Sequence, residues 1–171
     1  DILKGLGQVT VSWSVNTLDE GFRADMDEAV SIERRLAAMK KVYDAGIRTV
    51  CFVSPIFPGI TDIQAIFGRV REQCDLVWLE NLNLRGGFKS VIMDYIAVKQ
   101  SELMPLYEEI YQHGSREYWR GLETQAAQMA KEKGCPYLVN DLPYGRSEPG
   151  RPAVVNYFYH EEIRKKNGKG S

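Results

Sequence analysis

The sequence predicts an α/β fold with a parallel sheet, because strand patterns and helix patterns alternate along its first half. Val9–Val15 alternates apolar with small polar residues, as a strand does, while Thr49–Val53 and Leu76–Leu79 are short apolar runs. Apolar residues spaced three or four apart separate these runs, within Ile32–Tyr43 and Ile63–Cys74. Such a series of strands joined by helices forms a parallel sheet with right-handed crossovers.

Turn and cap signals divide these segments. Gly46 stands where a glycine commonly ends a helix, and the prolines and glycine of Pro55–Gly59 are expected to end the second strand. Thr61–Gln64 has the spacing of a capping box, which makes Thr61 the expected cap of the next helix. Asn16–Asp27, with Gly21 and several acids, is expected to be a polar connection.

The second half of the chain predicts a mainly helical region, and we place the boundary between residues 1–95 and 96–171. Leu103–Tyr111 and Trp119–Met129 each carry a helical stripe of apolar residues. Tyr137–Val139 is expected to be a short strand, and Val154–Tyr159 either a last strand or an aromatic segment packed on the body. The end, Lys165–Ser171, is expected to be frayed.

Composition fits one globular domain and excludes several classes of protein. Of 171 residues, 44% are hydrophobic, and 22 basic against 23 acidic side chains leave a net charge of −1. Global charge therefore does not support a nucleic-acid partner. No apolar run approaches the roughly 20 residues of a membrane span. Cys51, Cys74 and Cys135 are too widely spaced for a disulfide framework or a zinc knuckle, and no secretory leader is evident, so we expect a cytoplasmic protein.

Polar residues stand at the ends of all four expected strands. They are Ser14 and Asn16, then Ser54, then Glu80, Asn81 and Asn83, then Asn140 and Asp141. Ligands of parallel α/β folds bind at the carboxyl ends of the strands, so these side chains are candidates for one site. For any single residue, the start of a polar loop explains its position equally well. Ser12 and Ser14 carry more information, because alternation places both on one side of their strand.

These residues alone suggest two alternative functions. In the first, Glu80 and Asp141 are the ligands or acid–base groups of a small metal-dependent α/β enzyme. In the second, the chain is a non-catalytic interaction domain that buries an open sheet against a partner or a second copy. Neither a dinucleotide fingerprint nor a Walker A loop is present.

Three stretches resemble radical S-adenosylmethionine (radical SAM) enzymes, and most closely the spore photoproduct lyase or DNA repair photolyase-like group. They are Val9–Asp19, Ile32–Ile47 and Val53–Asp62, and Tyr118-Trp119 with Asn156–His160 resemble the C-terminal region of that group. The resemblance implies an α/β fold in which the three strands are the second half of a partial parallel β/α barrel, followed by a mainly helical C-terminal region.

The resemblance also implies a set of cofactor-binding residues. Ser12, Ser14 and Asn16 stand where the family's fourth strand meets the ribose and methionyl groups of SAM. The family's fifth-strand adenine motif, G-x-I-x-G-x-x-E, corresponds here to Pro55-x-Phe57-x-Gly59-x-x-Asp62, which keeps the second glycine and an acid but replaces the first two positions. Leu79–Asn83 stands where the family's sixth strand approaches the adenine or the substrate. With Ser54 from the strand ends, the full expected set is Ser12, Ser14, Asn16, Ser54, Gly59, Asp62, Asn81 and Asn83.

The cluster-binding loop of the family, C-x-x-x-C-x-x-C, is absent from this sequence. The resemblance therefore implies a fragment that lacks the N-terminal half of its parent, and that missing half is its expected partner. The parent would use SAM and a 4Fe-4S cluster to generate a 5′-deoxyadenosyl radical, and a DNA lesion is the substrate that the group's name suggests. We expect the chain alone to be inactive and to self-associate.

Overall fold

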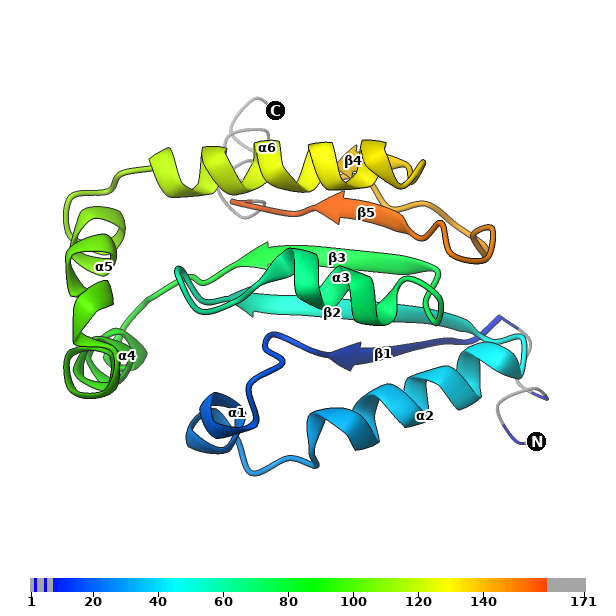
Figure 1. The fold of residues 1–171 in the computed structure, drawn as a ribbon, viewed down its shortest axis with the longest axis horizontal. Helices are drawn as coiled ribbons and strands as arrows, with labels where there is room; N and C mark the ends of the chain where they lie inside the picture. Colours follow the sequence, from blue (N-terminus) through cyan, green and yellow to red (C-terminus); the bar gives the residue numbers. More distant parts are fainter. Residues whose placement is uncertain (1, 3–4, 6–7, 160–171) are drawn as a thin grey trace, which may run out of the picture.

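The computed structural model describes residues 2, 5 and 8–159 and shows one sheet of parallel strands (Figure 1). The strands are β1 (Thr10–Ser14), β2 (Arg48–Ile56), β3 (Leu76–Asn81), β4 (Tyr137–Val139) and β5 (Ala153–Asn156). They lie in the order β1-β2-β3-β5-β4, and every neighbouring pair is parallel. The predicted α/β class and parallel sheet are therefore confirmed.

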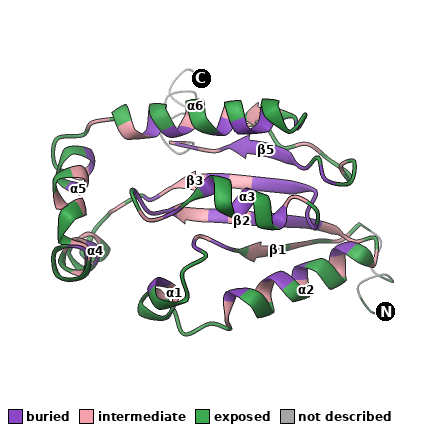
Figure 2. Cartoon of the chain, viewed as in Figure 1, coloured by how far each residue is buried: buried purple, intermediate pink, exposed green. Residues whose placement is uncertain are grey.

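Three helices cover one face of this sheet. Within the described residues the helices are α1 (Glu20–Met26), α2 (Ile32–Asp44), α3 (Ile63–Val70), α4 (Gly87–Lys99), α5 (Met104–Tyr111) and α6 (Glu117–Glu132), with a 3-10 turn η2 (Ser101–Leu103). Buried side chains of α2, α3 and α6, such as Met39, Ile66 and Ala126, form the main core with Val53 and Leu79 of the sheet. In Figure 2 the central strands carry the buried positions, whereas β1 is exposed or half-buried along its length.

In the described part of the chain, no helix contributes to the cluster of side chains on the opposite face of the sheet. Val50, Leu76, Ala153 and Val155 form a separate buried cluster, with Phe52, Trp78, Leu138 and Tyr157 packed against it. Strand register and alternation add Ser12, Ser14, Ser54 and Glu80 to the same side. We call this surface the helix-free face: Ser12, Ser14, Val50, Phe52, Ser54, Leu76, Trp78, Glu80 and Val155.

A second core lies beyond the carboxyl ends of the strands, where the arrowheads point toward α1, α4 and α5 (Figure 1). Its buried residues come from these helices and from the segments that follow β2 and β3. They are Phe22, Phe57, Leu82, Ile92, Ile96 and Tyr107. This core holds the loops at the carboxyl edge in place, which is where a ligand site of a parallel sheet forms.

Helix α1 corrects the prediction of a plain polar connection over Asn16–Asp27. The carboxylate of Asp19 caps α1 by accepting hydrogen bonds from the backbone N–H groups of Gly21 and Phe22. Phe22 then packs edge-on against Phe57 with ring centroids 4.9 Å apart. A seven-residue helix with a single buried residue is too short to show an apolar period.

Two further details near the end of β2 were predicted wrongly. The strand continues through a cis Ser54–Pro55 bond to Ile56 instead of ending at Pro55. Asp62, not Thr61, caps α3, and its carboxylate accepts from the N–H groups of Gln64 and Ala65. The Thr61 hydroxyl instead accepts from the Phe57 N–H at 2.9 Å and donates to the Asn16 carbonyl at 2.7 Å.

The second half of the described chain contains α5 and α6 and two strands, β4 and β5, which extend the same sheet. Strand β5 pairs directly with β3, and the boundary expected between residues 95 and 96 falls inside α4, a helix that the pattern did not indicate. The expected frayed end at Lys165–Ser171, and His160, lie outside the described residues. Within residues 2, 5 and 8–159, no helix has the length and apolar character to cross a membrane.

Candidate functional site

The carboxyl end of the helix-free face presents polar side chains from three adjacent strands. The Ser54 hydroxyl donates to a carboxylate oxygen of Glu80 at 2.9 Å, which links the ends of β2 and β3. Ser12 and Ser14 are exposed on β1, where the register places Ser14 beside Phe52. The structure therefore brings Ser12, Ser14 and Ser54 of the predicted set to one face.

An aromatic row lies on the same face, next to these polar groups. The ring of Trp78 lies 5.1 Å from that of Phe52 and 4.4 Å from that of Tyr157, centroid to centroid. The indole nitrogen of Trp78 is buried and has no hydrogen-bond partner among the residues that the structure describes. An unmet buried donor costs about 1–3 kcal/mol, so ring packing, and not a hydrogen bond within the described residues, holds Trp78 in place.

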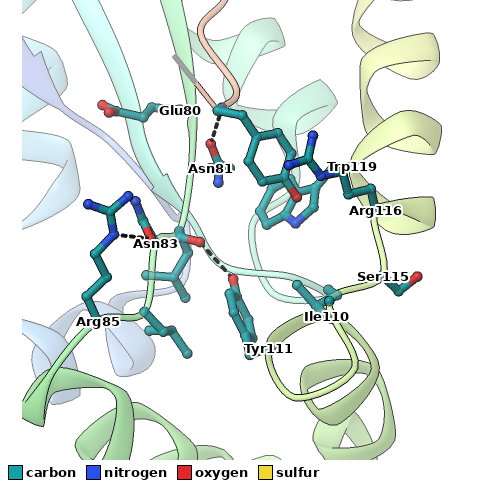
Figure 3. Close-up of a pocket in the computed structure, with 13 residues that line it drawn as sticks. Glu80, Asn81, Asn83, Arg85, Ile110, Tyr111, Ser115, Arg116 and Trp119 are labelled. Atoms are coloured by element: carbon teal, nitrogen blue, oxygen red, sulfur yellow. Dashed lines mark hydrogen bonds between the residues drawn. The ribbon is translucent and has the colours of Figure 1, made fainter. Parts of the chain in front are cut away.

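A pocket of about 340 Å³ lies beyond the end of β3, between that strand and the α5–α6 connection (Figure 3). This volume is at the lower end of the range for small-molecule sites. Its lining comprises Glu80, Asn81, Leu82, Asn83, Leu84, Arg85, Ile110, Tyr111, Gly114, Ser115, Arg116, Trp119 and Tyr159. We call it the β3–α6 pocket. Asn81 and Asn83 of the predicted set lie here, and Glu80 borders both this pocket and the helix-free face.

Hydrogen bonds fix the walls of the β3–α6 pocket. The Tyr111 hydroxyl donates to the Leu82 carbonyl at 3.0 Å, and the Asn81 side-chain oxygen accepts from the Tyr159 N–H at 2.9 Å. Burial raises the pKa of Tyr111 well above its usual range, so this phenol stays a neutral donor at physiological pH. The pocket is therefore held in shape by contacts between segments far apart in the sequence.

Gly59 and Asp62, the predicted adenine-binding positions, lie elsewhere. They line a shallow depression between the start of α3 and α6, beside Tyr118. The Gly59 N–H donates to the Tyr118 hydroxyl at 3.1 Å, and the carboxylate of Asp62 is engaged as the α3 cap. Asn16 is half-buried, and its backbone carbonyl accepts from Thr61. The predicted SAM-binding residues are thus divided between the helix-free face, the β3–α6 pocket and the region around the depression beside Tyr118.

Glu80 lies in β3 and Asp141 follows β4, and these strands are not neighbours because β5 lies between them. Two strand spacings separate them by roughly 10 Å. Asp141 also accepts a hydrogen bond from the Leu142 N–H at 2.9 Å. No cluster of three or more His, Cys, Asp or Glu side chains suited to a metal ion occurs within residues 2, 5 and 8–159.

The cysteines are core residues, as expected for Cys51. All three are buried and unpaired. Burial raises the pKa of the Cys51 thiol to about 12 and raises those of Cys74 and Cys135 as well. A cysteine binds a metal or a cluster as its thiolate, and burial keeps these three thiols protonated.

Five lining residues of the β3–α6 pocket had no signal in the sequence. Arg85 follows a strand end, whereas Tyr111, Ser115, Arg116 and Trp119 come from a helix end and a helix start about thirty residues later. Helical spacing marked Tyr111 and Trp119 only as apolar-face residues. Their meeting with β3 depends on tertiary packing, which periodicity does not encode.

Comparisons with known proteins relate the chain to one longer archaeal protein. It is 29% identical over 86 residues to an uncharacterized protein of Methanocaldococcus jannaschii, a match that covers 50% of this chain and 33% of the relative. The chain thus spans about a third of the length of the curated relative it matches. Neither a family model nor a solved structure matches. These comparisons assign no family.

Proposed function

We propose that this chain is the C-terminal half of a radical SAM enzyme and supplies part of its SAM-binding and substrate pocket. The parent's N-terminal half would complete a partial β/α barrel and hold the cluster. The observation that carries the proposal is the helix-free face, with its serines, Glu80 and aromatic row at the carboxyl end of the strands. The resemblance of the three sequence stretches agrees with it.

The winding of β1, β2 and β3 supports a barrel segment. These strands are adjacent in chain order and parallel, and α2 and α3, which connect them, both contribute to the core on one face. A doubly wound sheet places its helices on both faces, whereas a barrel places them all outside. The helix-free face then corresponds to the barrel interior.

The free edge of β1 supports a missing neighbour. Among the described residues, strand β1 pairs with β2 alone, and no described strand pairs with its other edge. Its residues are half-buried or exposed throughout, unlike those of β3, its counterpart on the other side of β2. An additional strand at this edge would satisfy the backbone and extend the helix-free face.

The donor set of the helix-free face fits SAM. Ser14 and Ser54 offer hydroxyl groups, and the Glu80 carboxylate accepts hydrogen bonds, which suits a ribose and an amino-acid group. Trp78 and Phe52 offer apolar ring surface that excludes water. Gly59 and Asp62 do not fit an adenine site in this arrangement, because Asp62 is engaged as a helix cap.

The cluster does not fit the described residues, since their cysteines are buried and dispersed. In the complete enzyme, bound SAM would supply a 5′-deoxyadenosyl radical and release methionine after accepting one electron from the cluster of the missing half. The residues of this chain bind and orient: Ser14 and Ser54 hold hydroxyl groups, and Glu80 fixes the Ser54 side chain. The chain alone is expected to bind without turnover.

Isothermal titration with S-adenosylhomocysteine, an unreactive analogue, tests this proposal. We expect binding by the wild-type chain that weakens at least fivefold in Ser54→Ala and in Glu80→Gln. Asp62→Asn is the matched control, because asparagine caps a helix as well as aspartate does and the site does not include it. It should bind like the wild type.

Loss of binding in Asp62→Asn with no effect of Ser54→Ala would overturn this assignment of the site. Absence of any binding, together with a stable dimer in sedimentation experiments, would favour the interaction-domain alternative, with a second copy on the helix-free face. Stabilisation by Mg²⁺ or Mn²⁺ that Glu80→Ala removes would favour the metal-dependent alternative.

A further inference from the structure

The backbone groups of β1 point alternately toward β2 and away from it. The Val15 N–H donates to the Phe52 carbonyl at 2.8 Å, so this N–H points toward β2. Successive residues of a strand present their N–H and C=O groups to opposite sides. The backbone groups of Thr10, Ser12 and Ser14 therefore point away from β2, along an edge with which no described strand pairs. We call this the outer edge of β1.

Arg35 of α2 occupies the carboxyl end of this outer edge. Its Nη1 donates to the backbone carbonyl of Ser14 at 3.2 Å. The rest of the guanidinium is held by the protein, because Nε donates to the Val30 carbonyl at 2.9 Å and Nη2 donates to both carboxylate oxygens of Asp27, at 2.9 and 3.1 Å. The Arg35 side chain is 11% exposed. A fixed, charged group thus lies where an added strand would need the Ser14 carbonyl.

A second copy of this chain can bring an identical edge to this position. Two identical strand edges related by a two-fold axis pair antiparallel, and residues directly opposite each other exchange N–H···O=C bonds. An axis at Ser12 places Ser12 of both copies opposite each other, and places Thr10 of each copy opposite Ser14 of the other. Both flanking pairs then need the Ser14 carbonyl, which already accepts from Arg35. Only the central pair at Ser12 forms without displacing the guanidinium.

We propose that Arg35 limits the pairing of the outer edge of β1 with a second copy of this chain. Charged side chains at an edge strand are one means by which proteins restrict strand addition. Here the guanidinium closes the edge at Ser14 and leaves the groups of Thr10 and Ser12 open, so the wild-type chain associates weakly. This inference stands on the backbone contacts of β1 and does not depend on SAM binding.

Sedimentation equilibrium of the wild-type chain and of Arg35→Gln tests the proposal. Glutamine is shorter than arginine and uncharged, so the variant frees the Ser14 carbonyl, and we expect a dimer dissociation constant at least fivefold lower. Arg34→Gln is the matched control, because it makes the same change of net charge at the preceding, exposed residue of α2. It should associate like the wild type.

A second substitution shows whether the gain arises at the outer edge. Ser12→Pro removes an N–H that points away from β2, a change that an edge strand tolerates, so adding it to Arg35→Gln should reverse the gain. Unfolding midpoints identify a variant that fails to fold. If Arg35→Gln does, Arg35→Lys replaces it, because lysine lacks the planar fork that reaches three partners at once, and the gain should be at least twofold.

Three results would each overturn the proposal. One is equal association of the wild type and the Arg35 variant that folds. Another is an equal gain in Arg34→Gln, which would assign the effect to net charge. The third is a gain that Ser12→Pro leaves unchanged, which would place the contact away from the outer edge. None of them bears on the assignment of the helix-free face to SAM.

Discussion

Asp75 places a buried carboxylate at the amino end of β3, where it joins three segments of the chain. Its side chain is 1% exposed and accepts from the Thr49 N–H at 2.9 Å, the Ser147 N–H at 3.1 Å and Arg146 at 3.2 Å. These contacts attach the long connection between β4 and β5 to the body of the sheet.

Asp75→Asn should lower the free energy of unfolding by about 2 kcal/mol, because it weakens charge-assisted hydrogen bonds that water cannot replace. Urea denaturation measures this change. Asp44→Asn is the control, since Asp44 pairs with Lys40 at the surface and should contribute less than about 0.5 kcal/mol. Equal effects of the two variants would contradict the role given to Asp75.

Because the Cys51 thiol is buried, we expect the folded protein to lose stability at high pH. Its thiol pKa is raised to about 12 by burial, whereas an unfolded thiol titrates near about 8.5. The stabilising contribution is therefore complete below pH ~8.5 and is lost as pH rises toward 12, because only the unfolded chain releases the proton. Denaturation series from pH 8 to 11 should show a shallower decline in Cys51→Ala than in the wild type. Parallel curves would show that this thiol ionises in the folded protein.

At the carboxyl edge of the sheet, the positions of some candidate site residues could be predicted from the sequence and others could not. Ser12, Ser14 and Ser54 share one face, as alternation and strand ends indicated. Gly59 and Asp62 have the spacing of the family's adenine motif. The Asp62 carboxylate, however, caps α3, and both residues line the depression beside α6. A short polar side chain before a helix serves as a cap as readily as it serves a ligand, and spacing alone does not distinguish the two.

Among the elements, the turn before α3 depends on Gly59. Its φ is +74°, and an added Cβ would lie 2.7 Å from a methyl carbon of Leu103. Gly59→Ala should therefore lower the free energy of unfolding by about 1–2 kcal/mol.

At Gly121, in α6, an added methyl group should stabilise the protein instead. A Cβ there meets open space, so Gly121→Ala should raise the free energy of unfolding by about 0.5–1 kcal/mol through helix propensity. The two variants measured together in urea are the test. A loss of stability in Gly121→Ala would indicate that α6 packs differently from the structure.

Helix prediction succeeded where an apolar stripe was long. Within α2 and α6 the buried residues recur at three and four positions, and both helices were predicted. Helix α4 was not predicted, because its apolar residues lie on all sides of the helix and show no helical period. Phe88, Val91 and Val98 are exposed, while Ile92 and Ile96 are buried. Its buried face is defined only by the second core, which assembles from segments distant in the sequence.

For the whole molecule, the parallel α/β class followed from the alternation of patterns, but the strand order did not. The position of β5 between β3 and β4 depends on the connection of residues 140–152. Arg48 holds that connection at the amino end of the sheet by donating to the carbonyls of Pro143 and Gly145. Such contacts across about 95 residues have no local sequence signal.

The edge of β1 that no described strand pairs with predicts self-association of the isolated chain. An unpaired strand edge favours pairing with the same edge of another copy. Ser12→Lys adds a charge to this surface and should shift sedimentation profiles toward monomer. Ser101→Lys, in the exposed η2 turn, should behave like the wild type. A wild-type chain that stays monomeric at high concentration would contradict this prediction.

The central claim is that the carboxyl end of the helix-free face binds a SAM-like ligand, and nuclear magnetic resonance tests it most directly. Amide and indole signals of the labelled chain would be followed during titration with S-adenosylhomocysteine. We predict shifts at Ser14, Ser54 and Glu80 and at the indole N–H of Trp78, which has no acceptor in the described part of the chain. Shifts confined to the depression beside Gly59 and Tyr118, or no shifts at saturating ligand, would contradict the claim.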